Sequence, residues 1–576
     1  MRLLDRLDLA RGRGLTLGVL MERLGAVHGA RQLVDEADGG LAVTFAQAAD
    51  MVDRYAAGMA AESEPGDRVV LATANGYEQF LLTLAVARAG RLPCPVNSQM
   101  SAPEVDHVVA DSGASLVVRS GGDVEGERPY GPAAEADPRD VGALFYTSGT
   151  TGKPKGAELS HRGLLGGMSV ATLVPSTLHR GEMVLALPVA HIFGFGAVAG
   201  AACAGIPVRF FARFNPVKVL DAIEERRSTM FAGVPAMYRM LLEAGAADRD
   251  LTSVRLWISG ADAMPSELST QFKRFGATAS LPVVGPVGEA TFAEGYGMVE
   301  TGGGVAVRVS PPLVRTGLGG SVGLPLPGNV FKVVDEDGDE VPVGGSGELL
   351  LSGPGVLKGY HGAPEATAAA LTDDGWLRTG DIARRGVLGM INFEGRMKDV
   401  VKRGGYSVYT IEVEQTLEEH PDVLEAAVVA IPDVRDGEVP GAAVRLRAGT
   451  SLDGLDLGAW AAERLSKYKV PARFLAVDEL PRTGTDKVQR REIAAWFEDG
   501  PPPGPAPATR AKKATAKKAT AKKVTAKKAT AKKSAAKRAG ADKAAPRKGG
   551  AKKTTTGEAS ATRAAAKRAG PPKPEW

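Results

Sequence analysis

The sequence predicts an α/β fold: a large N-terminal domain of helix-covered sheets with a β-rich subdomain, a small α+β C-terminal domain on a hinge, and a disordered basic tail. Three observations predict this organisation. The chain has 576 residues, more than one ordinary hydrophobic core can hold. Short apolar runs alternate with helical patterns up to about residue 395, as in parallel sheets covered by helices. After residue 500 the composition changes to proline, lysine and alanine.

The N-terminal domain is predicted over residues 1–397, where strands and helices alternate. Residues 67–75 are expected to form a strand and 77–90 a helix, and residues 228–245 repeat that order. Residues 328–353 differ, because two strand-like runs flank the turn-forming stretch DEDGDE. Such a pattern favours a β-rich subdomain at that point of the chain.

A mobile C-terminal domain is predicted over residues 398–499. Its expected elements are a helix near 409–421, strands at 423–432 and 441–449, and a helix at 455–465. These elements are expected to form a small unit separate from the large domain.

The end of the chain is predicted to have no packed core. Residues 500–508 form a proline-rich linker, and residues 509–576 carry 17 Lys and 5 Arg against 1 Asp and 2 Glu, a net charge of +19. Because the whole chain carries +4, the other 508 residues carry 4 − 19 = −15. The repeat AKKAT spreads lysines around every face of a helix, so the tail is predicted to be disordered.

The tail also suggests a function of a different class, binding to polyanions. Its lysine density favours salt-dependent, sequence-independent attraction to DNA, RNA, polyphosphate or an anionic membrane surface. The alternative is a solubilising tether that folds onto the acidic remainder of the chain.

Cysteine usage and hydropathy favour a cytoplasmic protein without an integral membrane segment. Cys94 and Cys203 are too few for a disulfide framework or a cysteine zinc site. The 26 residues of Met183–Val208 contain no Asp, Glu, Lys or Arg, which is long enough to span a bilayer. Because Pro188, Pro207 and four glycines interrupt this segment, a buried strand, loop and helix are predicted instead. Peripheral association with a membrane or the nucleoid stays open, as does the oligomeric state.

The stretch YTSGTTGKPKG, Tyr146–Gly156, is suited to a bound polyphosphate. Its glycines expose backbone N–H groups, and its hydroxyls and lysines add further donors. It does not match the P-loop pattern, because only two residues separate Gly149 from Gly152 and Pro154 follows Lys153. Taken alone, a plain glycine-rich turn remains an equal alternative. The candidate nucleotide-binding residues of this loop are Thr147, Ser148, Gly149, Thr150, Thr151, Gly152 and Lys153.

Further polar residues stand in short motifs along the chain. They are His191 in LPVAHIFGFG, Glu300 in EGYGMVETGGG, Asp381 in GWLRTGDIARRG, Arg396 and Lys398 in GRMKDVVKRGG, and Lys487 in LPRTGTDKVQ. Each has a structural alternative: a packed histidine, a helix cap, a turn aspartate or solvated bases. Their order and spacing together favour a shared site.

Together these motifs resemble the acyl-adenylate-forming (AMP-binding) superfamily, most of all fatty acyl-CoA synthetases of the long-chain-fatty-acid–CoA ligase and 4-coumarate–CoA ligase type. The resemblance covers nearly all of residues 20–498 and rests on YTSGTTGKPKG, YGMVE, RTGDIA, GRMKD and PRTGTDK in the family's order. It implies an acid–thiol ligase that uses ATP, Mg²⁺ and CoA. Such an enzyme converts a carboxylic acid and ATP into acyl-AMP and pyrophosphate, and then transfers the acyl group to CoA.

The resemblance also implies roles for residues of the nucleotide site. The Tyr146–Gly156 loop would wrap the β- and γ-phosphates of ATP, Glu300 would hold Mg²⁺, and Lys487 would bridge the substrate carboxylate and the α-phosphate. Asp381 would accept both ribose hydroxyls while Arg396 donates to the ribose. The expected adenine pocket consists of a stacking Tyr296, the adenine acceptor Glu294, and Ala261, Gly295 and Gly297.

For the thiol step, Lys398 would be the hinge, and the Gly404–Gly405 loop would reach the pantetheine tunnel. His191, counted with Lys487 and Glu300 among the catalytic candidates, would lie with Phe193 at the mouth of the acyl pocket.

The chain departs from the family pattern at several positions. Val299 replaces the usual threonine of YGMTE, which removes one hydrogen bond worth about 1–3 kcal/mol, and Thr301 is the candidate to compensate for it. The other departures are Asp486 for glycine, Ser407 for asparagine and Thr410 for proline.

The substrate is expected to be a fatty acid first and an aromatic acid second. The stretch AHIFGFGAVAG is apolar and offers no acid to pair with an amino group. An aryl-CoA ligase and an acyl-AMP ligase without a CoA step stay open as alternatives, as does a carrier protein in place of CoA.

Overall fold

The computed structural model describes residues 12, 14–147, 153–169, 171, 181–313, 321–404, 406–482 and 487–500. The predicted basic tail, and the predicted linker after Gly500, lie outside the described residues.

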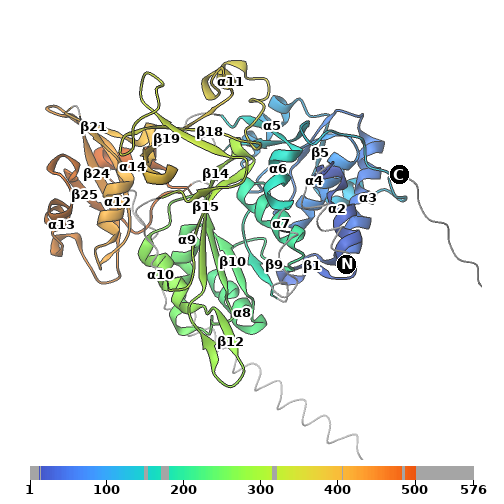
Figure 1. Cartoon of the computed structure of the whole chain (residues 1–576), viewed down its shortest axis with the longest axis horizontal. Helices are drawn as coiled ribbons and strands as arrows, with labels where there is room; N and C mark the ends of the chain where they lie inside the picture. Colours follow the sequence, from blue (N-terminus) through green and yellow to red (C-terminus); the bar gives the residue numbers. More distant parts are fainter. Residues whose placement is uncertain are drawn as a thin grey trace, which may run out of the picture. The chain divides into compact units, whose positions relative to one another are not determined.

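The centre of the large domain is a nine-stranded sheet with the strand order β16-β15-β14-β11-β10-β8-β9-β1-β2 (Figure 1). Its inner strands from β14 to β1 run parallel, while β2, β15 and β16 pair antiparallel at the two edges. The strands are β1 (Gln32–Glu36), β2 (Ala42–Thr44), β8 (Met183–Leu185), β9 (Val208–Phe210), β10 (Met230–Gly233), β11 (Leu256–Gly260), β14 (Thr291–Met298), β15 (Gly303–Ser310) and β16 (Leu324–Pro325). The predicted α/β class is confirmed.

Smaller sheets accompany the central one. β3 (Arg68–Leu71) pairs in parallel with β4 (Leu92–Pro95) and β5 (Leu116–Val118). Two antiparallel hairpins consist of β6 (Val141–Tyr146) with β7 (Gly156–Ser160), and of β12 (Ala279–Leu281) with β13 (Gly285–Val287).

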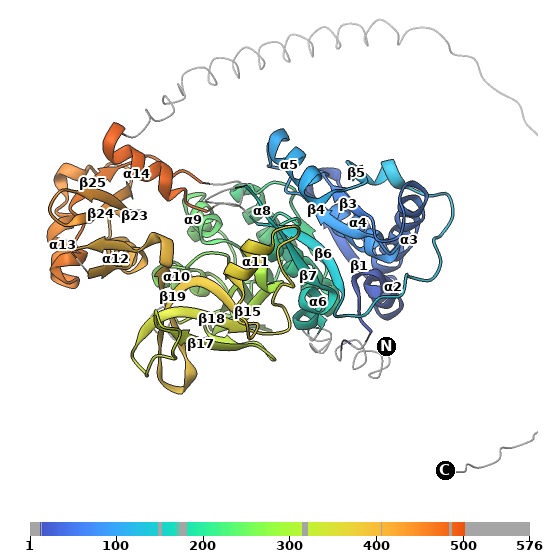
Figure 2. The ribbon, with the colours of Figure 1, turned by 90° about the horizontal axis from the view of Figure 1, so that it is seen from above.

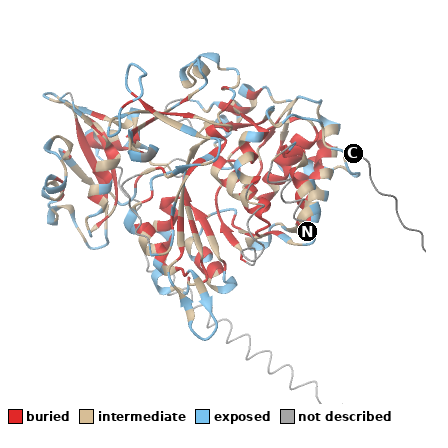
Figure 3. Cartoon of the chain, in the orientation of Figure 1, coloured by how far each residue is buried: buried red, intermediate tan, exposed pale blue. Residues whose placement is uncertain are grey.

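The helices of the large domain alternate with these strands, as the sequence predicts. They are α2 (Leu17–His28), α3 (Phe45–Glu62), α4 (Tyr77–Arg88), α5 (Ala102–Ser112), α6 (His161–Ser169), α7 (Ile192–Ala204), α8 (Pro216–Arg226), α9 (Pro235–Glu243) and α10 (Ser266–Phe275). Figure 3 shows that the buried residues concentrate along the strands of the main sheet and in helices such as α4, every residue of which is buried except Glu78.

The long apolar segment Met183–Val208 folds as the strand β8, a loop, the helix α7 and the strand β9. Helix α7 packs against α6 and β15. Across the described parts of the chain, no helix combines the length and the apolar character needed to cross a bilayer. The prediction of a buried strand, loop and helix is therefore confirmed.

The β-rich subdomain is an antiparallel sheet of four strands in sequence order. These are β17 (Val330–Val334), β18 (Ser346–Ser352), β19 (Leu377–Arg385) and β20 (Ile391–Arg396), with helix α11 (Pro364–Ala370) between β18 and β19. A core cluster that includes Val333, Leu349 and Ala383 holds this sheet together.

The small domain has a core of its own, with helices on both faces of one sheet (Figure 2). Helices α12 and α13 cover one face and α14 the other. Alternate residues of β23 divide between the two faces, Ala426 and Val428 toward α12, and Ala427 and Val429 toward α14. The elements are β21 (Val401–Arg403), β22 (Tyr406–Val408), α12 (Thr410–Glu418), β23 (Val423–Asp433), β24 (Gly437–Leu446), α13 (Leu457–Arg464), β25 (Arg473–Ala476) and α14 (Arg490–Asp499).

Candidate active site

The candidate site lies at the carboxyl ends of three adjacent parallel strands, β10, β11 and β14. In open α/β sheets this edge is where ligands bind. Ala261 and Asp262 follow β11 directly, and Val234 follows β10. These residues and Lys487 line one cavity. The predicted catalytic lysine therefore lies at the carboxyl ends of the parallel strands. Ala261 has a φ of 69°, an unusual conformation for a residue with a side chain.

Strand β14 carries the predicted adenine pocket and continues into the turn η6 (Val299–Thr301), which carries Glu300. Thr301 is 2% exposed, and its hydroxyl bonds the backbone N–H of Met298 and the carbonyl groups of Met298 and Gly303. Through these contacts the Thr301 hydroxyl binds the backbone on both sides of the turn that carries Glu300.

Tyr296, Asp381 and Arg396 form one connected group. The Tyr296 hydroxyl donates to Asp381 Oδ2 at 2.6 Å, and Arg396 Nε lies 3.4 Å from Asp381 Oδ1. Asp381 on β19 stands directly opposite Arg396 on β20, which explains why residues fifteen positions apart meet. Burial raises the pKa of Asp381 above its usual value, and the positive charge of Arg396 opposes that rise. Tyr296 and Arg396 thus hold the buried Asp381 carboxylate in a fixed orientation.

Glu300 is held by a residue that the motifs did not single out, Tyr360. The Tyr360 hydroxyl donates to Glu300 Oε1 at 2.8 Å, and the Lys155 ammonium lies 5.3 Å from the centre of the Tyr360 ring. The glycine-rich loop that joins β6 to β7 is therefore linked to the predicted magnesium ligand through one aromatic side chain. The only sequence feature that could have pointed to Tyr360 is the stretch LKGYHGAPE, in which a tyrosine stands beside a glycine before a turn.

Lys487 lies in the midst of the predicted site residues. Burial lowers its pKa below the usual value, and the nearby positive charges of Arg396 and Lys398 lower it further, while Asp262 and Glu300 act in the opposite sense. A partly desolvated ammonium close to both a carboxylate and the predicted ribose-binding pair, Asp381 and Arg396, is suited to attract anions. Residues far apart in sequence, from His191 to Lys487, are thus brought together.

His191 begins helix α7 as its N-cap, and its Nδ1 accepts from the Phe193 backbone N–H at 3.3 Å. Burial, with the nearby charge of Lys487, lowers the pKa of His191 to about 4. The imidazole is therefore neutral at physiological pH, with Nδ1 as acceptor and Nε2 carrying the proton.

The glycine-rich loop is described only at its two ends. Thr147 bonds Lys155 through both its backbone N–H (3.0 Å) and its hydroxyl (3.3 Å), and Lys153 is exposed. Ser148, Gly149, Thr150, Thr151 and Gly152 lie outside the described residues.

The remaining predicted positions have varied surroundings. Glu294 on β14 is bound by Arg308 of β15, whose Nη2 contacts both carboxylate oxygens at 2.5 Å, so much of its acceptor capacity is already used. Lys398 lies in the turn η8 (Met397–Asp399) between the two domains, and burial lowers its pKa. Gly404 has a positive φ of 54°, while Gly405 and Asp486 lie outside the described residues.

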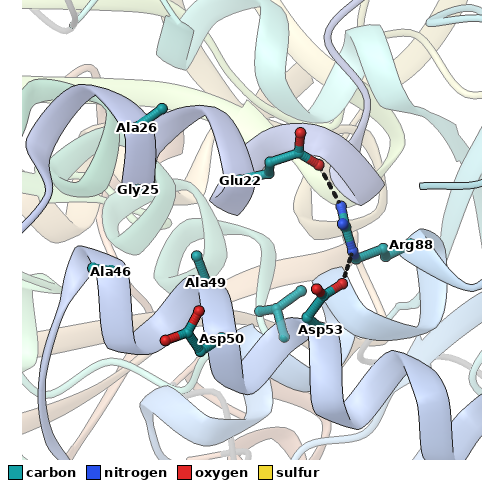
Figure 4. Close-up of a pocket in the computed structure, with 9 residues that line it drawn as sticks. Glu22, Gly25, Ala26, Ala46, Ala49, Asp50, Asp53 and Arg88 are labelled. Atoms are coloured by element: carbon teal, nitrogen blue, oxygen red, sulfur yellow. Dashed lines mark hydrogen bonds and ion pairs between the residues drawn. The ribbon is translucent and has the colours of Figure 1, made fainter. Parts of the chain in front are cut away.

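A second pocket lies away from this site, between α2 and α3 (Figure 4). Arg88 connects the two helices, because it pairs with Glu22 of α2 at 2.7 Å and with Asp53 of α3 at 2.6 Å. The guanidinium also donates to the carbonyl groups of Gly18 and Gly131. Because Arg88 is so fully engaged within the fold, we assign this pocket a structural role.

Gly297 allows β14 and β15 to approach closely, so replacing it is expected to destabilise the fold. A Cβ at position 297 would lie 2.1 Å from the Gly303 carbonyl oxygen. We expect Gly297→Ala to lower the free energy of unfolding by about 1–3 kcal/mol, measured by chemical denaturation. Gly295→Ala is the matched control on the same strand, because its Cβ would lie 3.9 Å from the nearest atom, the Ser259 oxygen. Equal stability of the two variants would contradict the close approach.

The low pKa of His191 predicts that the charge of this residue does not shape the pH dependence of the protein's activity near neutrality. The imidazole takes a proton only as the pH falls through about 4, so any stability that depends on neutral His191 is present above pH 6.5 and declines below it. We expect His191→Asn, which keeps an N-cap acceptor, to leave the acid limb of the rate profile between pH 5.5 and 7.5 in place. If the rate of this variant no longer falls as the pH is lowered from 7.5 to 5.5, His191 titrates in that range.

The sequence also matches known protein families. Residues 22–130 and 120–361 match the AMP-binding enzyme family, and residues 412–487 match the AMP-binding enzyme C-terminal domain. A feruloyl-CoA synthase from Amycolatopsis sp is 36% identical over 483 residues, which cover 80% of this chain and 95% of that protein. A long-chain-fatty-acid–CoA ligase from Bacillus subtilis is 34% identical over 359 residues, which cover 62% of this chain and 61% of that protein.

A solved structure shares the fold. ATP-bound MatB from Rhodopseudomonas palustris superposes with a TM-score of 0.72 at 28% identity, covering 84% of this chain and 99% of that chain.

Proposed function

Because the chain belongs to the AMP-binding enzyme family and is an ATP-dependent, AMP-forming acyl-CoA ligase, we propose that Lys487 and the residues around it form its acyl-adenylate site. The enzyme uses ATP, Mg²⁺ and CoA. The observation that carries the assignment of the site is that Lys487 lines one cavity with Ala261 and Asp262, at the carboxyl edge of the parallel sheet.

The first step is attack of a substrate carboxylate oxygen on the α-phosphorus of ATP. The bond to the bridging oxygen of the β-phosphate breaks, and pyrophosphate leaves with the electron pair. Two anions must approach each other, so the Lys487 ammonium lowers the barrier by neutralising charge between them. Asp381 accepts from the ribose hydroxyls, with Tyr296 and Arg396 fixing its orientation.

The donor set fits a magnesium ion carried mainly by the nucleotide. Among the residues that the structure describes, no group of three or more His, Cys, Asp or Glu could hold a metal alone. One carboxylate, Glu300, with phosphate oxygens suits Mg²⁺, which neutralises phosphate charge when bound. Tyr360 donates to Oε1 of Glu300 and fixes that carboxylate, whose Oε2 would be available to hold the ion.

The thiol step is assigned to a second orientation of the small domain. We place the boundary between the domains in the turn η8, where residue 397 ends the large domain and Lys398 begins the small one, so that the small domain extends over residues 398–499. Rotation there withdraws Lys487 and brings the Gly404–Gly405 loop to the site.

We propose an acid with an apolar, aromatic body as the substrate, with a fatty acid as the second candidate. The relatives that match this chain include a feruloyl-CoA synthase and a long-chain-fatty-acid–CoA ligase. The first of these matches over a larger share of its own length, 95% against 61%, which supports the aromatic class. Apolar Val234, Pro235 and Ala236 beside Lys487 suit both classes.

A panel of acids tests the substrate class. Ferulic, coumaric and benzoic acids are offered beside fatty acids of increasing length, and the CoA thioester is measured by mass spectrometry. We expect the cinnamic-type acids to give the highest kcat/KM. A preference for long aliphatic acids would reverse the assignment, and AMP release without thioester would favour an acyl-AMP ligase.

For the tail we propose polyanion binding, supported by its charge of +19 over residues 509–576. The full chain is expected to retard DNA in a gel at low salt, and a chain that ends at Asp499 is not. Equal retardation of DNA by both chains would show that the tail does not bind it. The same comparison with anionic vesicles and polyphosphate separates membrane and phosphate partners from nucleic acid.

A further inference from the structure

An arginine of the large domain is clamped between two carboxylates of the small domain. Arg239 lies on α9, the helix that follows β10 in the chain. Its Nη2 is 2.9 Å from Glu418 Oε1 on α12, and its Nη1 is 2.9 Å from Glu425 Oε1 on β23. The side chains of Arg239, Glu418 and Glu425 are only 16%, 14% and 5% exposed. This is therefore a desolvated ion-pair cluster between domains rather than a surface contact.

Glu425 also contacts Arg482, which lies five positions before Lys487 in the chain. The same oxygen that Arg239 contacts also accepts from Arg482, and the other oxygen lies 3.7 Å from Arg445. Arg445 in turn pairs with Glu243 at the end of α9, which gives the two domains a second ion pair.

Arg482 belongs to the loop that carries Lys487. Arg482 and Val488 form an antiparallel bridge, and the Gln489 N–H donates to the Pro481 carbonyl at 2.8 Å. These contacts join Pro481 and Arg482 to the two residues that follow Lys487. Arg239, Arg482 and Lys487 line the same cavity. A short chain of contacts thus runs from Arg239 through Glu425 to Arg482, which lines the cavity together with Lys487.

The cluster is sensitive to the loss of Arg239. Removing one partner of a buried ion pair leaves the other charges desolvated and uncompensated. Burial raises the pKa of Glu418 to about 7, and Arg239 is the main influence that holds it down. Without the arginine, the charges of Glu418 and Glu425 would be less well compensated, and the two domains would lose the two ion pairs that Arg239 makes between them.

We propose that Arg239 is a positioning residue for adenylation: it docks the small domain so that Lys487 is held in the nucleotide site. Its role is confined to the first half-reaction, because the thiol step uses another orientation of the small domain. The inference rests on the two-step function proposed above.

The test measures the two half-reactions separately in the full chain. Adenylation is followed as acid-dependent exchange of labelled pyrophosphate into ATP, and the thiol step as CoA thioester formed from synthetic acyl-adenylate. We expect Arg239→Gln to slow the exchange by about 10- to 100-fold and to leave the thiol step unchanged. Glu418→Gln, which removes the partner on the other domain, is expected to show the same split.

Arg227→Gln is the matched control, because Arg227 pairs with Asp250 at an exposed site within the large domain. It should alter neither half-reaction. If wild-type protein performs neither step, the proposed function fails. If wild type is active but Arg239→Gln slows both steps equally, or slows neither, the positioning role is wrong. Glu418→Gln decides the question should Arg239→Gln fail to fold.

Discussion

Replacing Lys487 by alanine is expected to slow acyl-adenylate formation by about 10²- to 10³-fold, the usual cost of removing one preorganised charge-stabilising group. The ammonium lines one cavity with Asp262 and interacts electrostatically with Glu300 and Asp381. Its partial desolvation strengthens its attraction for the two anions that must meet. The rate is measured as acid-dependent pyrophosphate release under saturating ATP.

The thiol step provides an internal control for this variant. Lys487 is expected to leave the site before CoA attacks, so Lys487→Ala should still convert synthetic acyl-adenylate to thioester. Lys218→Ala is the matched surface control, since Lys218 pairs with Asp38 at an exposed site. Adenylation that survives Lys487→Ala at full rate would refute the role of this lysine.

Replacing Asp381 by asparagine is expected to weaken AMP binding by about 100-fold. The carboxylate is 2% exposed and can accept from two ribose hydroxyls, and each hydrogen bond to a charged group is worth about 1.5–3 kcal/mol. Asparagine keeps the volume but loses one acceptor and the negative charge opposite Arg396. The dissociation constant of AMP is measured by isothermal titration calorimetry.

Asp374→Asn is the matched control for this prediction. Asp374 lies near the start of β19, the same strand that carries Asp381, but its side chain is 66% exposed. It should bind AMP as the wild type does. Unchanged affinity in Asp381→Asn would remove Asp381 from the nucleotide site.

The sequence predicted the fold class and most elements because periodicity and turn residues are local signals. The strand and helix expected over residues 67–90 appear as β3 and α4, and the two runs around DEDGDE appear as β17 and β18. Strand β25 was not predicted, because the four residues Arg473–Ala476 are too few to show alternation. Their pairing with β24 is a long-range contact that the local pattern does not contain.

The candidate site was predictable where a residue stands in a distinctive motif, and not where its role comes from a neighbour. Tyr360 acts through Glu300, sixty positions earlier in the chain. Arg239 acts through carboxylates that are nearly two hundred residues away. For Thr301, the expected substitute for the hydrogen bond lost at Val299, the sequence did not show that its hydroxyl also bonds the carbonyl groups of Met298 and Gly303.

The exchange of labelled pyrophosphate into ATP tests the central claim most directly, because it reports the reversible first step without any thiol. We predict exchange by the wild-type protein that requires both Mg²⁺ and a carboxylic acid of the accepted class. No exchange with any acid of the aromatic and aliphatic panel, or exchange that proceeds without acid, would contradict the account.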